Sequence, residues 1–367
     1  MMVISFFRII EYKKYCIVPD VITSALSKSL NNFNRITLIL HASYDYFNDR
    51  ILSQVDAWDG PISLSIYIHS IKSSKRLSMY LQKVSDCISL HDDKAYRAIP
   101  PFLLNIRNYS SQIENKVSVH AFFYSNNKCD IEKINGRDDL QWNFTEHVYP
   151  INVARNIARM MARTKYILLG DYDFIFSESF ERDISKLADK ILIRNPKTVL
   201  AFRIFEAVGS GLRVPRNKSA LYKAYKNGTA IEFHAIYAKG AHSIPELESW
   251  FQSKNHSEPS TSITLRYNRA SWEPQFVSLT SIPFHDENFP YPIRDNTELR
   301  WEMCRLNYTF ILVNDHFMVH PGIKRYSGMA RKRYKKTAQI MFQSAIKKFR
   351  QRMDMCCPET KKLCPKF

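Results

Sequence analysis

Two aspartates in mid-chain form the motif with the most specific chemistry. Asp171 and Asp173 flank one tyrosine directly after the apolar run Tyr166–Leu169 and Gly170, and more apolar residues follow. An isolated Asp-x-Asp is usually a solvated turn, but two like charges beside an apolar strand are costly to desolvate without a cation or hydrogen-bond donors. Carboxylate oxygens are ligands that hard divalent cations prefer. The pair therefore predicts a metal site at the end of a buried strand.

A histidine and a lysine far downstream could complete this site. An apolar stretch ends at His320, and Lys324 follows beyond Gly322, which permits a tight turn. A lone histidine in such a place is more often a core residue, so the prediction depends on its combination with the acid pair. A neutral imidazole would add a metal ligand, and the ammonium would meet a diphosphate bound to the same metal. Together these residues predict a site for a metal-bound nucleoside diphosphate.

The elements that must position these residues alternate between strands and helices. Apolar runs predict strands at 36–41, 62–68, 117–124, 166–169 and 198–202. Helical spacing of apolar residues predicts helices at about 75–87 and 152–162. This alternation is typical of an α/β fold with a mostly parallel central sheet flanked by helices. Ligands of such sheets bind beyond the carboxyl ends of the strands, which is where Asp171 lies.

The composition describes a folded chain with a basic tail. Of the 367 residues, 45% are hydrophobic and 13% aromatic, which excludes intrinsic disorder as the overall state. The net charge of +18 would by itself suggest a nucleic-acid partner. However, 14 basic and two acidic residues lie in 321–367, so this tail carries most of the charge. We therefore expect no nucleic-acid partner, and nine glycines disfavour a dinucleotide or P-loop architecture.

The chain divides into one main domain and two flanking segments. We expect an N-terminal segment at 1–34, interpreted as the remnant of a stem or anchor, a main domain at 35–325 and a basic tail with cysteines at 326–367. Apolar residues between 334 and 353 follow helical spacing, so the tail is predicted to contain an amphipathic helix that packs on the main domain. The alternative is a binding arm for acidic glycans or a membrane surface.

Cysteines and sequons bear on the compartment. The seven cysteines form no Cys-x-x-Cys pair and have no histidine at metal-ligand spacing, which argues against a structural zinc site. Asn-x-Ser/Thr sequons begin at 108, 143, 217, 227, 255 and 307, and they favour the secretory pathway. The apolar start is interrupted by Arg8 and is far shorter than the roughly 20 residues of a spanning helix. Either the protein is soluble or a longer anchored form exists.

A series of stretches, in order along the chain, resembles glycosyltransferase family 49, which contains glucuronyltransferases that modify dystroglycan and members labelled as N-acetylglucosaminyltransferases. The stretches are Ile36-Thr-Leu-Ile-Leu-His-Ala-Ser43, Trp58-Asp-Gly-Pro-Ile-Ser63, Tyr149-Pro-Ile-Asn-Val-Ala-Arg-Asn-Ile-Ala-Arg159, Asp171-Tyr-Asp173, Pro215-Arg-Asn-Lys218, Trp272-Glu-Pro274, Phe284-His-Asp-Glu-Asn-Phe289 and Phe317-Met-Val-His-Pro-Gly-Ile-Lys324. They span roughly residues 35–325. A collinear series of this length indicates kinship.

The resemblance implies a fold, an activity and a set of site residues. It implies a GT-A type fold and a manganese-dependent inverting transfer from a UDP-sugar to a glycan or glycoprotein acceptor, in protein O-mannosyl glycan synthesis. It also implies residence in the Golgi membrane with a lumenal catalytic domain. The implied metal ligands are Asp171, Asp173 and His320. The implied donor contacts are Arg155, Asn156, Lys324 and His41.

Inversion at the anomeric carbon needs a general base, and a carboxylate is the usual choice. The candidates are Asp286, Glu287 and Glu273. Because adjacent acids point apart, only one of Asp286 and Glu287 is expected to face the sugar, and we prefer Asp286.

The donor sugar is left open between glucuronic acid and N-acetylglucosamine. The segment after Phe289 lacks the Tyr-Gly and lysine that the family has there. A glucuronyl donor would need an arginine near its carboxylate, for which Arg155, Arg203 and Arg213 are candidates. The altered segment also leaves open a transferase-like carbohydrate-binding protein that has lost turnover.

Overall fold

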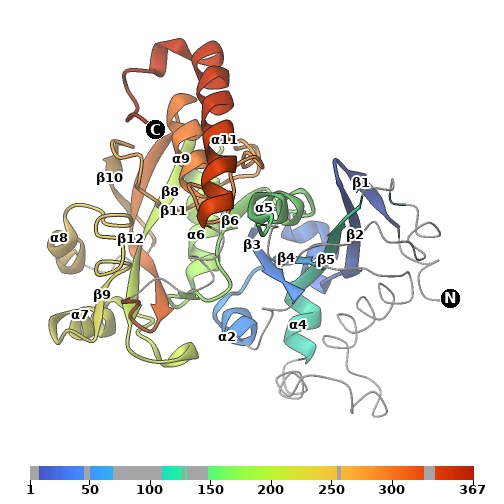
Figure 1. Ribbon diagram of the computed structural model, residues 1–367. Coiled ribbons are helices and arrows are strands. Elements are labelled where there is room, and N and C mark those ends of the chain that lie inside the picture. The colour runs from blue at the N-terminus through green and yellow to red at the C-terminus, as the bar shows by residue number, and fades with distance from the viewer. Residues whose placement is uncertain are drawn as a thin grey trace.

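One mixed sheet organises the protein (Figure 1). The computed structural model describes residues 8–44, 50–68, 110–125, 129, 148–253, 258–325 and 335–367. Across the sheet the strands follow the order β1 (Ile10–Tyr12), β2 (Tyr15–Ile22), β5 (Val117–Tyr124), β4 (Ile62–Tyr67), β3 (Ile36–Ser43), β6 (Tyr166–Leu169), β11 (Gln275–Leu279), β8 (Thr198–Ala207), β12 (Thr309–Pro321) and β10 (Thr261–Leu265). The short strands β7 (Ile175–Phe176) and β9 (Ala230–Glu232) pair with β12 and β8.

Strand direction changes along the sheet, so it is parallel only in part. Strands β5, β4, β3 and β6 run parallel to one another, and so do β8 and β12. Strand β11 runs antiparallel to both β6 and β8, and β2 and β10 are antiparallel to their inner neighbours. The α/β class is confirmed. The expected parallel arrangement is present in these two blocks, but the sheet as a whole is mixed. Because β11 is reversed, its start lies at the same edge as the carboxyl ends of β6 and β8.

Helices flank this sheet, and most of the predicted elements are present. The helices are α1 (Ala25–Lys28), α2 (Arg50–Ala57), α4 (Ser110–Lys116), α5 (Ile151–Met160), α6 (Phe180–Ile191), α7 (Lys218–Lys226), α8 (Leu247–Gln252), α9 (Thr297–Arg305) and α11 (Lys335–Cys356). The five predicted strands, the helix near 152–162 and the tail helix are confirmed. The predicted helix at 75–87 lies outside the described residues.

Helix α5 lies close against the parallel block because β4 presents small polar side chains to it. The hydroxyls of Ser63 and Ser65 donate hydrogen bonds of 2.6 and 2.8 Å to the carbonyl oxygens of Ala158 and Ala154. These bonds satisfy buried hydroxyl groups while the small side chains let the helix approach. The contact fixes α5 over β3 and β4, where its amino terminus faces the edge at which β3 and β6 end.

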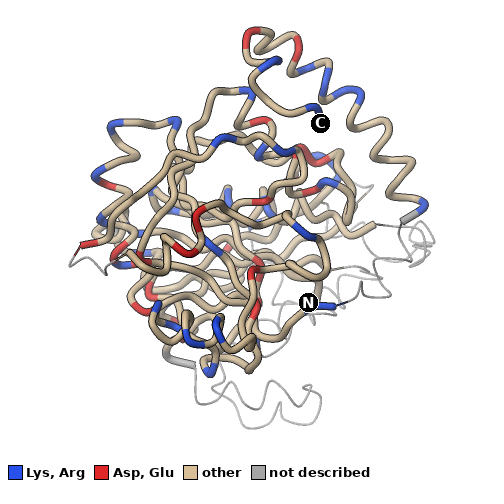
Figure 2. The backbone as a smooth tube through the Cα atoms, turned by 90° about the vertical axis from the view of Figure 1, so that its left-hand side faces the viewer, with Lys and Arg blue, Asp and Glu red and all other residues tan. Residues whose placement is uncertain are grey.

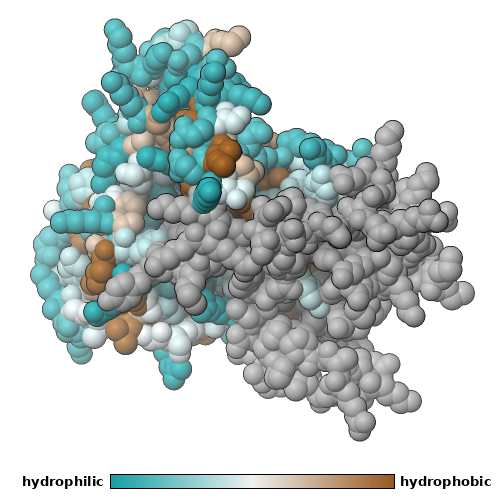
Figure 3. Space-filling model, viewed as in Figure 1, coloured by the Kyte–Doolittle hydropathy of each residue, from teal (hydrophilic) through white to brown (hydrophobic). Residues whose placement is uncertain are grey.

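The flanking segments join the same structure. Strands β1 and β2, from the segment expected to precede the main domain, extend the sheet beside β5. At the other end, α11 packs Phe349 against Phe289 and Trp301. Basic residues recur along α11 and the chain after it (Figure 2). Around α11, at the top of Figure 3, the described surface is mainly hydrophilic, as expected for an amphipathic helix.

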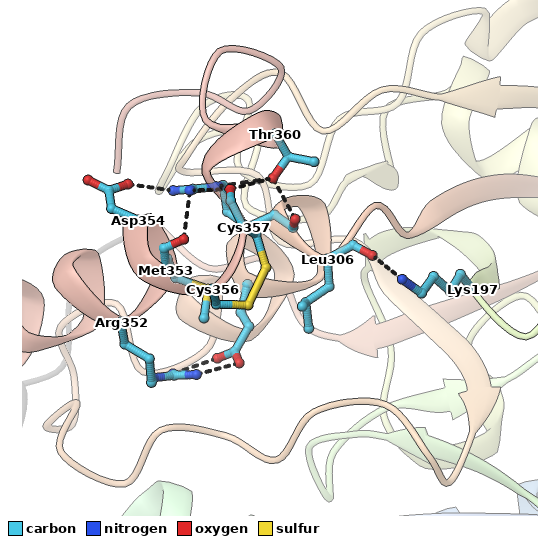
Figure 4. Close-up of a disulfide and its surroundings, with 10 residues drawn as sticks. Lys197, Leu306, Arg352, Met353, Asp354, Cys356, Cys357 and Thr360 are labelled. Atoms are coloured by element: carbon cyan, nitrogen blue, oxygen red, sulfur yellow. Dashed lines mark hydrogen bonds and ion pairs between the residues drawn. A yellow bond between two sulfur atoms is a disulfide. The ribbon is translucent and has the colours of Figure 1, made fainter.

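Disulfides fasten both ends of the chain. Cys16 pairs with Cys129, Cys304 with Cys364, and Cys356 with Cys357. Figure 4 shows the last pair, at the end of α11, beside the hydrogen bonds of Asp354 and Thr360. Within the described part of the chain, we find no helix whose length and apolar character would let it cross a membrane.

Candidate active site

A carboxylate and an imidazole from distant parts of the sequence meet at the sheet edge. Strand β7 pairs with β12 in a register that sets Ile175 opposite Val319, which brings Asp173 next to His320. The Nε2 atom of His320 lies 3.2 Å from Oδ2 of Asp173, although 147 positions separate the two residues. On the other side of the ring, Nδ1 lies 3.1 Å from the carbonyl oxygen of Gly322. This carbonyl holds the Nδ1 proton, so Nε2 is the nitrogen available to a metal.

The charges of this pair depend on each other. Burial lowers the pKa of His320, but the hydrogen bond and charge of Asp173 outweigh it and leave the pKa raised. Burial raises the pKa of Asp173, and the hydrogen bond and charge of His320 together with the charge of Arg50 outweigh it and leave the pKa lowered. Both shifts favour the charged forms, an imidazolium beside a carboxylate. A divalent cation would take the place of the proton between them.

Asp171 follows the end of β6 and is an exposed residue, whereas Asp173 is partly buried. The carbonyl oxygen of Asp171 accepts a hydrogen bond of 2.9 Å from Nε2 of Gln54. Burial raises the pKa of Asp171 to about 6; the charge of Arg155 opposes this, and the nearby carboxylates add to it. A carboxyl group desolvated in this way gains from a neighbouring cation.

These groups fit a hard divalent cation by chemistry, because carboxylate oxygens and a neutral imidazole are ligands that Mn²⁺ accepts. Among the residues that the structure describes, however, no three His, Cys, Asp or Glu side chains are gathered closely enough to hold a metal ion. Asp173 and His320 are thus two predicted ligands that already lie in contact, and Asp171 would have to move closer to join them.

Arg50 lies beside the pair, whereas Lys324, further along the chain, contacts a tyrosine ring. The Nη1 atom of Arg50 lies 3.8 Å from Oδ2 of Asp173. The Nζ atom of Lys324 lies 4.6 Å from the ring centre of Tyr237, and its backbone N–H donates a 3.1 Å hydrogen bond to Glu206. Glu206 is buried on β8 opposite His320 in the strand register, and burial raises its pKa. Sequence reasoning missed Arg50 and Glu206; an acid inside the apolar strand run after position 198 was the available signal for Glu206.

The polar side chains of α5 are buried, and those predicted to contact the donor bind other parts of the protein. Asn156 donates to the carbonyl oxygen of His285 and to Glu287, and its side-chain oxygen accepts the N–H of His285. Arg159 donates to the carbonyl oxygens of Thr280, Ile282 and Pro283. Both residues therefore hold the 280–287 segment. Arg155 instead turns toward Asp295, with 3.1 Å between Nη1 and Oδ2.

His41, near the end of β3, lies beside Arg155 on the side of the parallel block. Its Nδ1 is 3.1 Å from the hydroxyl of Tyr149, and its enclosed Nε2 has no hydrogen-bond partner in the structure. Burial and the charge of Arg155 lower the pKa of His41, so the ring is neutral. An enclosed nitrogen without a partner fits a position where a ligand supplies the missing hydrogen bond.

The predicted bases Asp286 and Glu287 face other partners. Glu287 accepts hydrogen bonds from the hydroxyl of Tyr12 and from Asn156, and it pairs with Lys13. Asp286 accepts hydrogen bonds from the backbone N–H and the side-chain amide of Asn288, and its Oδ2 lies 3.4 Å from Nη2 of Arg352 on α11. These contacts turn the two carboxylates toward the β1–β2 hairpin and α11, where they line a cavity of about 720 Å³.

Glu273 has a different position, just before β11 at the centre of the sheet edge. Its carboxylate lies 3.8 Å from Nε2 of His242, and its side chain is 33% exposed. Its charge is one of those that raise the pKa of Asp171. The neighbouring Trp272 is buried against Tyr267 and Phe310, so it is a packing residue rather than a platform for a sugar.

Comparisons with known proteins identify the family of the chain. The profile of the family described as "Glycosyl-transferase for dystroglycan" matches residues 35–355. Beta-1,4-glucuronyltransferase 1 of Mus musculus is 24% identical over 303 residues, which cover 82% of this chain and 71% of the relative. Xylosyl- and glucuronyltransferase LARGE1 of Gallus gallus is 23% identical over 206 residues, which cover 56% of this chain and 26% of the relative.

Among solved structures, GalNAc-T7 with UDP, GalNAc and Mn2+ aligns over 90% of this chain and 51% of its own, at 10% identity and a TM-score of 0.42. That likeness is too distant to support an argument. The family profile, in contrast, spans most of the chain, including both halves of the site. The protein belongs to glycosyltransferase family 49.

Proposed function

We propose that this protein is a metal-dependent, inverting glycosyltransferase of GT-A type that transfers a sugar from a UDP-sugar to a glycan acceptor. The contact between Asp173 and His320 carries the proposal, because it joins two predicted metal ligands from distant parts of the chain. Asp171, Asp173 and Nε2 of His320 would hold Mn²⁺. When bound, such an ion offsets the negative charge that develops on the diphosphate as the sugar leaves.

The protein's own groups would support the same step. Arg50 lies beside Asp173, and Lys324 follows His320 by four residues, so we propose that their positive charges bind the diphosphate and stabilise its growing charge. His41 and Tyr149 lie on the side of the parallel block and would contact the nucleoside through the unpartnered Nε2. This arrangement places the sugar between β3 and β12, over the start of β11.

The general base would then be Glu273. It precedes β11 in the middle of the edge, whereas Asp286 and Glu287 are held toward α11 and the β1–β2 hairpin. A carboxylate there can take the proton of the acceptor hydroxyl as the bond from its oxygen to the anomeric carbon forms. UDP departs on the opposite face of the sugar.

The compartment that suits this chemistry is the Golgi lumen. Disulfides persist in oxidising compartments, and two of the three pairs join residues far apart in the sequence. Membrane association in a longer form and a role in protein O-mannosyl glycan synthesis are parts of the proposal that the family alone supports.

Titration calorimetry tests the proposal. UDP is titrated into the protein with and without Mn²⁺, for the wild type and for Asp173→Asn and His320→Ala. We expect Mn²⁺-dependent binding that weakens by about tenfold to a hundredfold in each variant. Asp59→Asn is the matched control, since Asp59 pairs with Arg182 and precedes β4, at the opposite edge of the sheet.

If the affinity for UDP is the same with and without Mn²⁺ and in both variants, the proposed metal site is wrong. Turnover is a separate measurement. Release of UDP from UDP-sugars, stimulated by a glycan acceptor, would exclude the alternative of a carbohydrate-binding protein without catalysis, and binding without any release would favour it.

A further inference from the structure

Arg155, whose charge acts on Asp171, is already paired with an acid of the same chain. Nη1 of Arg155 lies 3.1 Å from Oδ2 of Asp295 and 2.9 Å from its carbonyl oxygen, and it also donates to Asn152. The side chains of Arg155 and Asp295 are only 9% and 13% exposed. An ion pair this enclosed keeps its partners, because separating them would leave an unpaired charge away from water. Arg155 therefore offers hydrogen bonds to a ligand but little net positive charge.

The other arginines that were candidates to bind a sugar carboxylate also have partners within the protein. Arg203 is buried, donates to the carbonyl oxygens of Ile244 and Pro245, and lies 5.5 Å from the ring centre of Trp250. Arg213 donates to the hydroxyl of Ser210 in an exposed turn. Neither guanidinium is directed to the sheet edge by these contacts.

The middle of the edge carries negative charge instead. Along it, His41 lies near the end of β3, Asp171 follows β6, Glu273 precedes β11 and His320 lies near the end of β12. Figure 1 shows these strands in the sheet. Glu273 precedes β11, which pairs with β6, and Asp295 lies 3.1 Å from Arg155 on α5, which covers the parallel block. A donor that binds its diphosphate near His320 and its base near His41 has its sugar over this acidic stretch.

From this arrangement we infer that the donor carries an uncharged sugar, such as a hexose or an N-acetylhexosamine, and that Asp295 excludes uronic acids by cancelling Arg155. The inference rests on the proposed function and narrows its donor class. A carboxylate at C6 would meet the carboxylates of Glu273 and Asp295, because Arg155 is paired with Asp295 while Lys324 and Arg50 are proposed to bind the diphosphate. Like charges in such a contact repel. The hydroxyl groups of a neutral sugar can donate to the same carboxylates.

UDP-glucose and UDP-glucuronic acid form a matched pair of probes, because they differ only in a hydroxymethyl group against a carboxylate. Both are titrated into the Mn²⁺-loaded protein by calorimetry, alongside UDP and UDP-N-acetylglucosamine. We expect UDP-glucose to bind at least about tenfold more tightly than UDP-glucuronic acid, since a single like-charge contact near a protein surface is worth this much or more. UDP-N-acetylglucosamine is also expected to bind more tightly than UDP-glucuronic acid.

Asp295→Asn tests the residue. The substitution keeps the shape of the side chain and frees the charge of Arg155, so the preference for UDP-glucose should fall by about tenfold or reverse. Glu273→Gln removes a second negative charge and should shift the preference in the same direction, which keeps the test usable if Asp295→Asn does not fold. Asp59→Asn removes one paired acid at the opposite edge and should leave the preference unchanged.

The outcomes separate the two proposals. If the wild type binds UDP but prefers UDP-glucuronic acid or does not discriminate, the inference is wrong and the proposed function stands. The same holds if folded Asp295→Asn and Glu273→Gln both keep the wild-type preference. If UDP itself does not bind with Mn²⁺, the proposed function fails and the inference fails with it.

Discussion

At the scale of single residues, the choice among three carboxylates decides the mechanism. We predict that Glu273→Gln lowers kcat by about a hundredfold to ten-thousandfold, because a positioned general base contributes this much. UDP binding with Mn²⁺ should change far less, since Glu273 is proposed to touch the acceptor and not the diphosphate. Acceptor-stimulated release of UDP under saturating donor measures the effect.

Asp286→Asn is the comparison for Glu273→Gln. It removes a carboxylate that already lies 3.4 Å from Arg352, so we expect it to keep most of the turnover. If Asp286→Asn abolished turnover while Glu273→Gln preserved it, the assignment of the base would be reversed. Circular dichroism of both variants separates a lost fold from a lost base.

Individual residues also mark how far sequence reasoning reaches into the site. Asp173 and His320 could be predicted because each follows or ends an apolar strand, and strand ends are where such folds gather ligands. The pairing of Arg155 with Asp295 could not, since 140 positions separate them and nothing local directs one to the other. The choice of Glu273 over Asp286 and Glu287 as the proposed base could not be predicted either. The sequence around these acids does not separate them, and only the reversed direction of β11 sets Glu273 at the edge where β6 and β8 end.

At the scale of elements, α5 shows why helix periodicity is an incomplete guide. Its apolar positions predicted the helix correctly, and its polar positions 152, 155, 156 and 159 would ordinarily face water. All four are buried, because the segment from 280 to 295 lies along them and supplies carbonyl and carboxylate partners. A polar helix face can therefore be an interior one when a later segment covers it.

The packing of α11 gives a stability prediction. Phe349 is buried against Phe289, Trp301 and Phe367. Phe349→Ala should lower the free energy of unfolding by about 3–5 kcal/mol, through lost burial and the cavity left behind. Ile340→Ala is the control on the same helix, because Ile340 is 69% exposed and its loss should stay within about 0.5 kcal/mol. Urea denaturation measures both, and equal effects would mean that α11 is not docked as described.

The disulfides at the carboxyl end allow a second test at this scale. Cys304 and Cys364 are 60 positions apart, so their bond restricts the unfolded chain, and Cys364→Ser should cost about 4 kcal/mol. Cys356 and Cys357 are adjacent and close no loop, so Cys357→Ser should cost far less by this mechanism. Thermal unfolding of the two variants compares them; a larger loss for Cys357→Ser would point to native packing instead of chain entropy.

At the scale of the whole molecule, the site depends on the continuity of the sheet. Asp171 follows the parallel block, His320 ends β12, and β11 with β8 joins the two across the middle. The proposed diphosphate site is therefore shared by the two halves, and the tail that packs on α9 and the 289 region supports the second half. Binding of UDP with Mn²⁺ should stabilise the molecule as a unit.

The response of the whole fold to acid follows from histidines that are buried without charge. His120 on β5 is fully buried, accepts the backbone N–H of Asp20 through Nδ1, and has its pKa lowered to about 3 by burial and by the charge of Arg163. Its pKa in the unfolded chain is about 6.5, so below that pH the unfolded state binds a proton that the folded state does not. The stability is therefore complete above about pH 6.5 and is lost as the pH falls toward 3, by roughly 3 kcal/mol at about pH 4 for this residue alone.

His120→Asn should remove this share of the pH dependence, because asparagine can accept the same hydrogen bond and does not titrate. The variant is expected to be less stable than the wild type near pH 7 but to lose less stability between about pH 7 and pH 4.5 in urea denaturation. His242, whose pKa burial lowers to about 4, remains in both proteins and contributes the same slope to each. Identical slopes for the two proteins would show that His120 takes up its proton in the folded state as readily as in the unfolded one.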